Sequence, residues 1–162
     1  MTIAITPAKP ADIAALADIA EEMDRFYGAT QMEPLDARLR QISEALFADP
    51  PSAYALLAWH DGKLAGFASY SFLWPAVGLT RSLYLKELYV IEANRGHGTG
   101  KLLMRHLCKT AAEHRCSRVE WTTDQDNRDS QQFYPNLGVT INASKLLYRI
   151  EGDDLRRGEG IG

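Results

Sequence analysis

Residues 83–103 read LYLKELYVIEANRGHGTGKLL. The first part, Leu83 to Ile91, is rich in Leu, Tyr and Val, as is typical of a mostly buried central strand, and it carries two charged residues, Lys86 and Glu87. The glycine-rich stretch Arg95 to Gly100 follows, and apolar residues then recur at helical spacing. Backbone N–H groups and the positive end of a helix dipole therefore meet between the strand and the helix. The sequence predicts an anion site at this loop.

The spacing of the loop glycines argues against two familiar nucleotide-binding loops. A Walker loop would need glycine where Arg95 stands and Ser or Thr where Leu102 stands. A Rossmann fingerprint would need its last glycine where Lys101 stands. Glycines at alternate positions would still let the backbone approach a phosphate without obstruction by a Cβ atom. The alternative is a glycine-rich connection that binds no ligand, with Arg95 and Lys101 as solvated charges.

Hydrophobic periodicity and turn residues predict one mixed α/β unit around this stretch. Expected helices cover 13–23, 35–46, the stretch from the glycine loop to His114, and 130–137; expected strands cover 2–5, 54–59, 64–72, 83–91, 119–123 and 139–150. Asp61-Gly62 predicts a hairpin turn. We expect an α/β (α+β) fold, a single domain over residues 1–151 whose mixed, mostly antiparallel central sheet is flanked by helices. A flexible polar tail is expected over 152–162.

Composition narrows the class of protein. The chain has 162 residues, enough for one sizeable core, and its 46% hydrophobic and 24% charged residues are ordinary for a globular protein. A net charge of −3 gives no general reason to bind nucleic acid or a membrane surface, and the apolar runs are too short to cross a bilayer. The N-terminus lacks a signal-peptide pattern, so a cytoplasmic location is expected. Two cysteines and four scattered histidines indicate no metal site.

The pattern Arg-x-x-Gly-x-Gly, formed by Arg95, Gly98 and Gly100, resembles the acetyl-CoA loop of the GNAT superfamily of N-acetyltransferases. The resemblance runs from Leu83 to Gly138 and includes NRDSQQFY at 127–134. It implies a GNAT-like acyl-CoA N-acyltransferase fold with acetyl-CoA as cosubstrate and no metal. The loop amides would hold the pyrophosphate, and the preceding strand would pair with the pantetheine arm. The residues that it assigns to the cofactor are Leu88, Tyr89, Val90, Arg95, Gly96, His97, Gly98, Thr99, Gly100, Lys101, Asn127 and Ser130.

Two side chains are candidates for the chemistry of acetyl transfer. An amine with a pKa near ~10 is mostly protonated at neutral pH, so a carboxylate base is useful, and Glu87 stands where the family often places one. Tyr134 stands where family members commonly have a Tyr that protonates the leaving sulfur. The alternatives are a rim or ion-pair charge for Glu87 and simple aromatic packing for Tyr134. The resemblance also implies that the Leu88–Val90 backbone donates the hydrogen bond that stabilises the oxyanion.

Some positions depart from the family pattern. Thr99 replaces a usual aliphatic residue, Pro135 directly follows Tyr134, and Val139 rather than an aromatic residue follows Gly138. These changes affect the expected details of the site more than the expected class of protein. Asn127 either caps the helix that follows it or contacts the pantetheine arm, and the two roles are compatible.

Within the superfamily, the residues of the strand and loop motifs are most similar to those of the diamine and polyamine acetyltransferase branch. Lys86 replaces the first of the adjacent acidic residues of that branch and would repel a cationic amine, which puts polyamine specificity in doubt. An acidic cluster at Glu21, Glu22 and Asp24 could contact an acceptor or be only a solvated face. The expected acceptor is a small-molecule primary amine, less readily a protein amine. The resemblance also points to a homodimer, although no interface stripe is legible.

Two other functions remain open at this stage. The chain could be an acyl-CoA-binding regulatory module without turnover, or a structural protein whose glycine turn binds nothing. The regulatory module would bind CoA, whereas the structural protein would not. Thiol release from acetyl-CoA would distinguish an enzyme from both.

Overall fold

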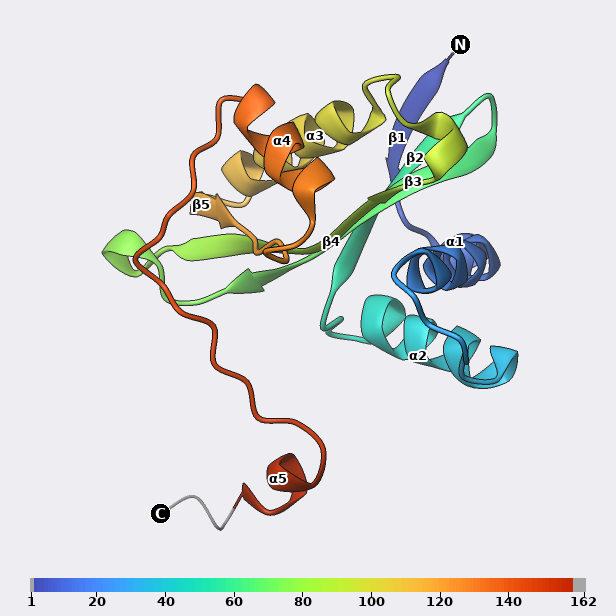
Figure 1. Cartoon of the computed structure of the whole chain (residues 1–162), viewed down its shortest axis with the longest axis horizontal. Coiled ribbons are helices and arrows are strands. Elements are labelled where there is room, and N and C mark those ends of the chain that lie inside the picture. Colours follow the sequence, from blue (N-terminus) through green and yellow to red (C-terminus); the bar gives the residue numbers. More distant parts are fainter. Residues whose placement is uncertain (1, 159–162) are drawn as a thin grey trace. The chain divides into compact units, whose positions relative to one another are not determined.

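The structure, a computed structural model, describes residues 2–158. Of these, residues 2–122 form one compact unit and residues 123–158 belong to another (Figure 1). The first unit contains β1 (Ile3–Pro7), α1 (Ile13–Phe26), α2 (Leu35–Phe47), β2 (Tyr54–His60), β3 (Lys63–Leu73), β4 (Arg81–Val90), α3 (Thr99–Glu113) and β5 (Cys116–Glu120). The second contains α4 (Arg128–Asn136) and α5 (Asp153–Arg156). No helix within residues 2–158 is long and apolar enough to cross a membrane.

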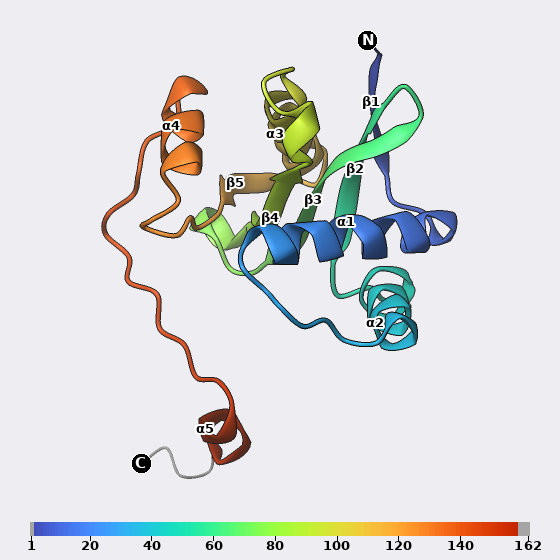
Figure 2. The same ribbon diagram turned by 45° about the vertical axis from the view of Figure 1, so that its right-hand side comes forward.

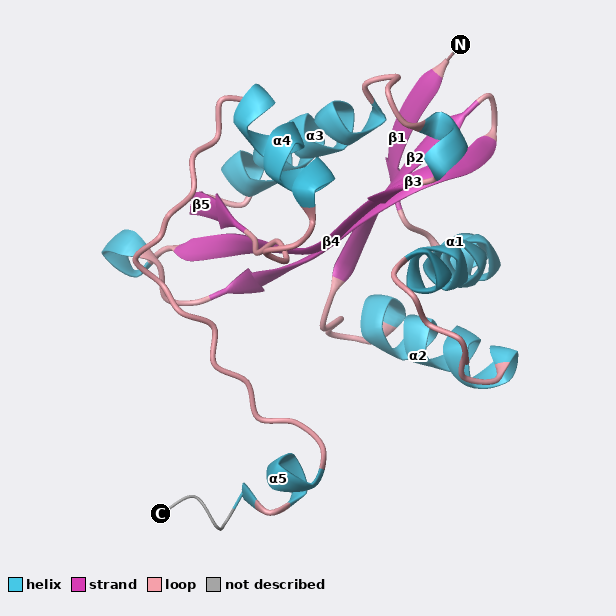
Figure 3. Ribbon diagram, in the orientation of Figure 1, coloured by secondary structure: helices cyan, strands magenta, loops and turns pink. Residues whose placement is uncertain are grey.

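The five strands form one sheet in the order β1-β2-β3-β4-β5 (Figure 3). The first four pair antiparallel, and β5 pairs parallel to β4 after the α3 crossover. This confirms the mixed, mostly antiparallel sheet expected from the sequence. The hairpin between β2 and β3 turns at Asp61 and Gly62, which both have positive φ (47° and 81°), as a two-residue primed turn requires.

Helices cover the two faces of the sheet, and Figure 2 shows α1 and α2 on one side of the strands and α3 on the other. Because side chains alternate along a strand, each strand contributes to both layers. The buried residues of the α1 layer are Leu16, Ile19, Ala55, Leu57, Phe67 and Tyr89. In the opposite layer Leu103 and Leu107 of α3 are fully buried, so the helix that follows the glycine loop is anchored firmly to the sheet.

Strand β4 has two irregularities. Its register with β3 shifts because Ser69 lies opposite Glu87 while Tyr70 lies opposite Leu85, which leaves Lys86 as a bulge residue. Its parallel pairing with β5 ends at Tyr84, whereas its pairing with β3 continues to Val90. Among the residues that the structure describes, the second half of β4 therefore has a strand on one side only.

Two expected strands differ from the structure. The strand expected over 119–123 lies at Cys116–Glu120, because Arg115 turns the chain with a φ of 56° and the strand starts at once. The strand expected over 139–150 is wrong for this chain as described: residues 139–150 form no strand, and residues 140–150 are all exposed. Strand propensity alone forms no strand, since the backbone groups need a neighbouring strand to bond.

The predicted helix at 130–137 corresponds to α4, and the chain leaves it through Gly138, whose φ is 81°. The flexible tail expected over 152–162 contains the one-turn helix α5. Residues 159–162 lie outside the described part of the chain.

Candidate active site

The second half of β4 offers a row of backbone groups on the side away from β3. In an antiparallel ladder, opposite residues either exchange both hydrogen bonds or point both groups outward, in alternation. The Ile91 N–H donates to the Ala65 carbonyl (2.8 Å), so counting back along the ladder puts Leu88 and Val90 in the outward class. Their N–H groups therefore point to the edge that β5 no longer covers.

Gly66 on β3 lets β4 lie close to its neighbour at this point. A Cβ atom built on Gly66 would come within 2.9 Å of the Tyr89 carbonyl oxygen. Real Cβ atoms do not approach backbone so closely, so a side chain here would displace β4. The position of the outward amides thus depends on a glycine that the sequence analysis did not single out.

The glycine loop joins β4 to α3 by way of a helical turn at Glu92–Asn94. Gly96 and Gly98 have positive φ (78° and 83°), and Gly98 is the N-cap of α3. The first helical hydrogen bond runs from the Leu102 N–H to the Gly98 carbonyl, so the N–H groups of residues 99–101 have no acceptor within the helix. Residues 96–98 are exposed. The loop therefore presents backbone N–H groups that have no acceptor within the helix, at the positive end of α3, as an anion site needs.

A buried polar network fixes the base of this loop. His60, at the end of β2, lies 2.7 Å from Thr99 (Nε2 to Oγ1) and 3.2 Å from Asn94 (Nδ1 to Nδ2). The Asn94 amide nitrogen can only donate, so Nδ1 accepts and the Nε2–H donates to the Thr99 hydroxyl. His60 and Thr99 are 6% and 2% exposed. This network explains why position 99 holds a hydroxyl instead of an aliphatic side chain.

Arg95 does more than carry a charge at the loop. Its Nε donates to the Val90 carbonyl (2.9 Å), and its guanidinium carbon lies 4.4 Å from the centre of the Phe26 ring and 5.5 Å from that of Tyr89. Such stacking holds a guanidinium in one place. Arg95 thus joins the start of the loop to the end of α1, and no local sequence pattern indicates this role for Phe26.

Tyr89 is the centre of this aromatic cluster. Its side chain is 2% exposed, and its hydroxyl donates to Glu22 Oε1 on α1 (3.1 Å). Burial raises the pKa of Tyr89 to about 12, and the nearby Glu22 carboxylate adds to the rise. Tyr89 is therefore a neutral anchor of β4 to α1 at physiological pH.

Glu87 is half-buried immediately after the bulge residue Lys86, which is exposed. It is two residues from Tyr89 and so lies on the same face of β4, the face that carries α1. The main-chain groups of Leu88 between them point to the open edge. A carboxylate and outward N–H groups thus occur within four residues of one strand.

Asn127, Ser130 and Tyr134 belong to the second unit. Asn127 Oδ1 accepts from the Ser130 N–H (3.2 Å), which confirms the expected N-cap of α4. Tyr134 is half-buried, and its ring centre lies 5.1 Å from that of Phe133.

Two members of the acidic cluster on α1, Glu21 and Glu22, contact other residues of the chain. Glu21 pairs with Arg25 at 2.8 Å and with Arg38 of α2 at 3.6 Å. The hydrogen bond from Arg25 lowers the pKa of Glu21. Arg38 also donates to the Ala17 carbonyl. Glu21 therefore ties α1 to α2.

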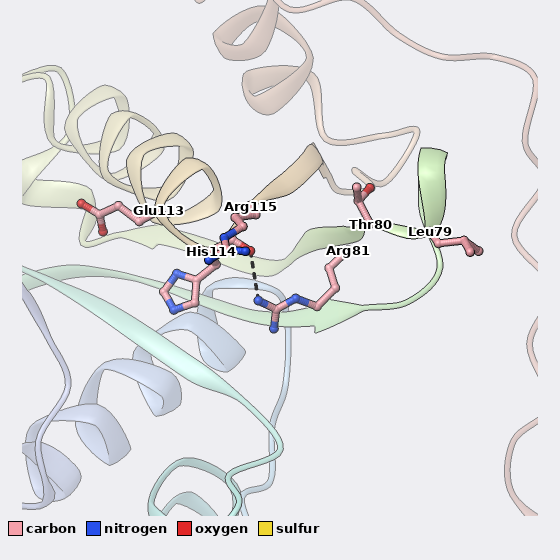
Figure 4. A pocket seen from close by; sticks show the side chains of 6 residues that line it. All are labelled: Leu79, Thr80, Arg81, Glu113, His114 and Arg115. Atoms are coloured by element: carbon pink, nitrogen blue, oxygen red, sulfur yellow. Dashed lines mark hydrogen bonds between the residues drawn. The ribbon is translucent and has the colours of Figure 1, made fainter.

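A surface hollow of about 480 Å³ lies at the other end of α3 (Figure 4). It is lined by Leu79, Thr80, Arg81, Glu113, His114 and Arg115. Arg81 donates to the His114 carbonyl there (3.0 Å) and so ties β4 to the end of the helix. A helix of this length spans roughly 22 Å, which separates the hollow from the glycine loop.

Known proteins resemble this chain in sequence and in structure. Residues 16–139 match the model of the acetyltransferase (GNAT) family. An uncharacterised N-acetyltransferase of Mycobacterium tuberculosis is 31% identical over 113 residues, which cover 70% of this chain and 69% of the relative. The thialysine N-epsilon-acetyltransferase of Mus musculus is 25% identical over 86% of this chain and 90% of its own. The solved structure of an integron cassette protein of V. cholerae is 29% identical, with a TM-score of 0.90 over 99% of both chains.

Proposed function

This chain belongs to the acetyltransferase (GNAT) family and is an acetyl-CoA-dependent N-acetyltransferase, and on that premise we propose that its acceptor is a small amino-acid-like primary amine. We further propose direct attack of the amine on the thioester, with Glu87 as the general base and Tyr134 as the general acid. The observation that carries the proposal is the half-paired strand β4, which leads through the turn at Glu92–Asn94 into the glycine loop.

The residues of the first unit fit acetyl-CoA as cosubstrate. A pantetheine arm is an extended chain with amide groups, and the open edge of β4 offers it the outward N–H groups of Leu88 and Val90 and the Leu88 carbonyl, in the manner of an added strand, while the Val90 carbonyl accepts from Arg95. A diphosphate carries negative charge, and the amides from Gly96 to Lys101 with the α3 dipole would hold it. The thioester supplies an activated acetyl group.

In the proposed reaction Glu87 accepts the proton of the ammonium group, directly or through a water, so that the nitrogen can attack. The new bond joins the nitrogen to the acetyl carbon, and an outward N–H group on β4 that the pantetheine arm does not occupy stabilises the negative oxygen. The carbon–sulfur bond then breaks, the Tyr134 hydroxyl donates its proton to the departing sulfur, and the second proton of the nitrogen returns through water to restore the phenol. Support for Glu87 comes from its place beside those amides, and support for Tyr134 from its motif.

Lys86 supports an acceptor that carries a carboxylate beside its amine. The side chain is exposed at the bulge, directly before the proposed base. It would repel a polyamine but attract the carboxylate of an amino acid. Relatives named for such substrates include an L-ornithine N5-acetyltransferase of Arabidopsis thaliana, 29% identical over 60% of this chain and 42% of its own, and the mouse thialysine enzyme.

The test is an acetyl-CoA assay that measures thiol release with a panel of amines, followed by mass spectrometry of each product. We expect ornithine and thialysine to gain 42 Da, the mass of one acetyl group in place of a hydrogen, on the order of tenfold faster than putrescine or spermidine, a difference of about 1.4 kcal/mol. Faster acetylation of polyamines would contradict the proposed acceptor class. An increase in melting temperature with acetyl-CoA but no thiol release would instead favour a non-catalytic acyl-CoA-binding module.

A further inference from the structure

The sheet face that carries α1 becomes polar beyond the α1 core. On β3, Ser69 and Ser71 follow Phe67 at alternate positions, so all three lie on this face. Glu87 is opposite Ser69 on β4 and therefore lies on the same face. Tyr84 is opposite Ser71 and lies on it as well. The α1 face thus continues from its apolar core past Glu87 to Tyr84.

Strand β5 adds two charged side chains to this face. Glu120 pairs with Tyr84, and Arg118 pairs with Ser82, two residues before Tyr84. The Ser82 hydroxyl, on a residue that is 3% exposed, donates to Glu120 Oε1 (2.8 Å). Arg118 Nη1 lies 3.9 Å from Glu120 Oε2, and these two side chains are 41% and 46% exposed. A buried hydroxyl therefore holds one oxygen of Glu120, while the other oxygen and the guanidinium form a loose, partly exposed ion pair.

Along β4, an acceptor whose amine lies at Glu87 can extend in only one direction on this face. Toward the glycine loop, the next positions are Phe67 and Tyr89, which are 6% and 2% exposed and belong to the α1 core. In the other direction Tyr84 is half-buried and Glu120 is exposed. Because burial of a charged group in the core would be costly, a charged acceptor extends over Tyr84 toward β5.

The length of this path fits a short amino acid. Glu87 and Tyr84 lie opposite β3 residues that are two apart, so roughly 7 Å separates them along the sheet. Glu120 lies one strand further, roughly 4.8 Å to the side. The Cα atoms of Glu87 and Glu120 are therefore about 8 Å apart. In extended ornithine about 5 Å separates the side-chain nitrogen from the α-carbon, so the two carboxylate side chains can reach both ends of it.

We propose that Arg118 and Glu120 bind the α-carboxylate and the α-ammonium group of the acceptor while its side-chain amine lies at Glu87. A guanidinium binds a carboxylate through two parallel hydrogen bonds, and Glu120 accepts from the ammonium group. The acceptor thus replaces one loose ion pair with two complementary pairs. A polyamine has no carboxylate, so its binding to Glu120 would leave Arg118 without a partner. The inference rests on the proposed function and names the residues that select its acceptor class.

Three acceptors that differ by one group test this assignment. Putrescine is ornithine without the α-carboxylate, and 5-aminopentanoate is ornithine without the α-amino group. The kcat/KM is measured with each acceptor for wild type, Arg118→Gln and Glu120→Gln. We expect Arg118→Gln to lower kcat/KM on the order of tenfold for ornithine and 5-aminopentanoate but not for putrescine. Glu120→Gln should lower it for ornithine and putrescine but not for 5-aminopentanoate.

Lys109→Gln is the matched control. Lys109 also forms a 3.9 Å ion pair with a glutamate, Glu113, but it lies on α3, on the other side of the sheet (Figure 2). Its replacement should change none of the three kcat/KM values. Thermal melting shows whether each variant is folded.

The outcomes separate this inference from the proposed function. If Arg118→Gln lowers kcat/KM equally for all three acceptors, or for none, the assignment of Arg118 is wrong while the acetyl transfer stands. If wild type releases no thiol with any amine, the proposed function is wrong. In that case calorimetry of ornithine binding to the CoA complex still tests the subsite: binding that Arg118→Gln weakens on the order of tenfold supports it, and absent or unchanged binding overturns it.

Discussion

Replacing Thr99 with valine tests the buried network under the glycine loop. Valine has nearly the shape of threonine but no hydroxyl, so Thr99→Val leaves the Nε2–H of His60 without an acceptor. Both side chains are buried, and an unsatisfied buried donor costs about 1–3 kcal/mol. For a chain of this size that loss lowers the melting temperature by roughly 2–12 °C.

The same change should also weaken acetyl-CoA binding. Thr99 is the first residue of α3, and Asn94 links the other side of His60 to the turn before the loop. Loss of the hydrogen bond therefore loosens the amides that we assign to the diphosphate. We expect the KM for acetyl-CoA to rise several-fold while kcat changes little, because no reacting group is altered.

Urea denaturation and steady-state kinetics measure the two effects separately. Thr99→Ser is the control, since it keeps the hydroxyl and should retain most of the stability and the wild-type KM. The double variant His60→Leu with Thr99→Val should recover part of the stability, because the buried pair then contains no unmatched donor and the half-buried Asn94 amide, which loses His60 as acceptor, can bond to water; it should keep the raised KM. If Thr99→Val matches wild type in both measurements, the network neither stabilises the fold nor positions the loop.

Four further predictions follow from other parts of the structure. Gly98→Ala places a side chain at a φ of 83° and should raise the KM for acetyl-CoA, whereas Gly28→Ala, at a φ of 98° and equally open, should cost a similar 1–2 kcal/mol, roughly, in unfolding experiments without changing the KM. Tyr134→Phe should lower kcat on the order of 10²-fold and leave the dissociation constant of acetyl-CoA unchanged; full activity in a folded variant would remove Tyr134 from the reaction. Lys86→Glu should shift the preference of the enzyme from amino acids toward diamines, as competition assays with putrescine and ornithine would show, and an unchanged ratio would contradict the role of Lys86. Because the pKa of Tyr89 is raised to about 12 in the fold, its contribution to stability is complete below pH 10 and is lost as the pH rises from 10 to 12; Tyr89→Phe should show a smaller fall in melting temperature across that range.

The elements around the glycine loop could be predicted because their signals are local. Leu83 to Ile91 is a continuous run of mostly strand-forming residues. Asp61-Gly62 is a turn signal that consists of two adjacent residues. The loop glycines likewise indicate the positive φ values that the structure has at Gly96 and Gly98. In each case the residue type and the required backbone conformation lie at the same place in the chain.

The parts that sequence analysis missed depend on distant residues. His60 and Thr99 are 39 positions apart and meet only because β2 and α3 pack together. The bulge at Lys86 follows from the register with β3, which the pattern of β4 alone does not contain. The strand expected over 139–150 failed for a related reason, since propensity describes a segment whereas pairing requires a second one.

Gly66 limits how this enzyme can be redesigned. Residues on β3 that face the α1 layer, such as Phe67, would be natural targets for reshaping the acceptor side, but their neighbour admits no carbon atom beyond its backbone. A library that randomises positions 64–69 should therefore return glycine at 66 in nearly every active clone, whatever acceptor is used for selection. Gly66 thus sets how closely β3 and β4 approach each other, and variation at the other positions is tolerated only while that distance is kept.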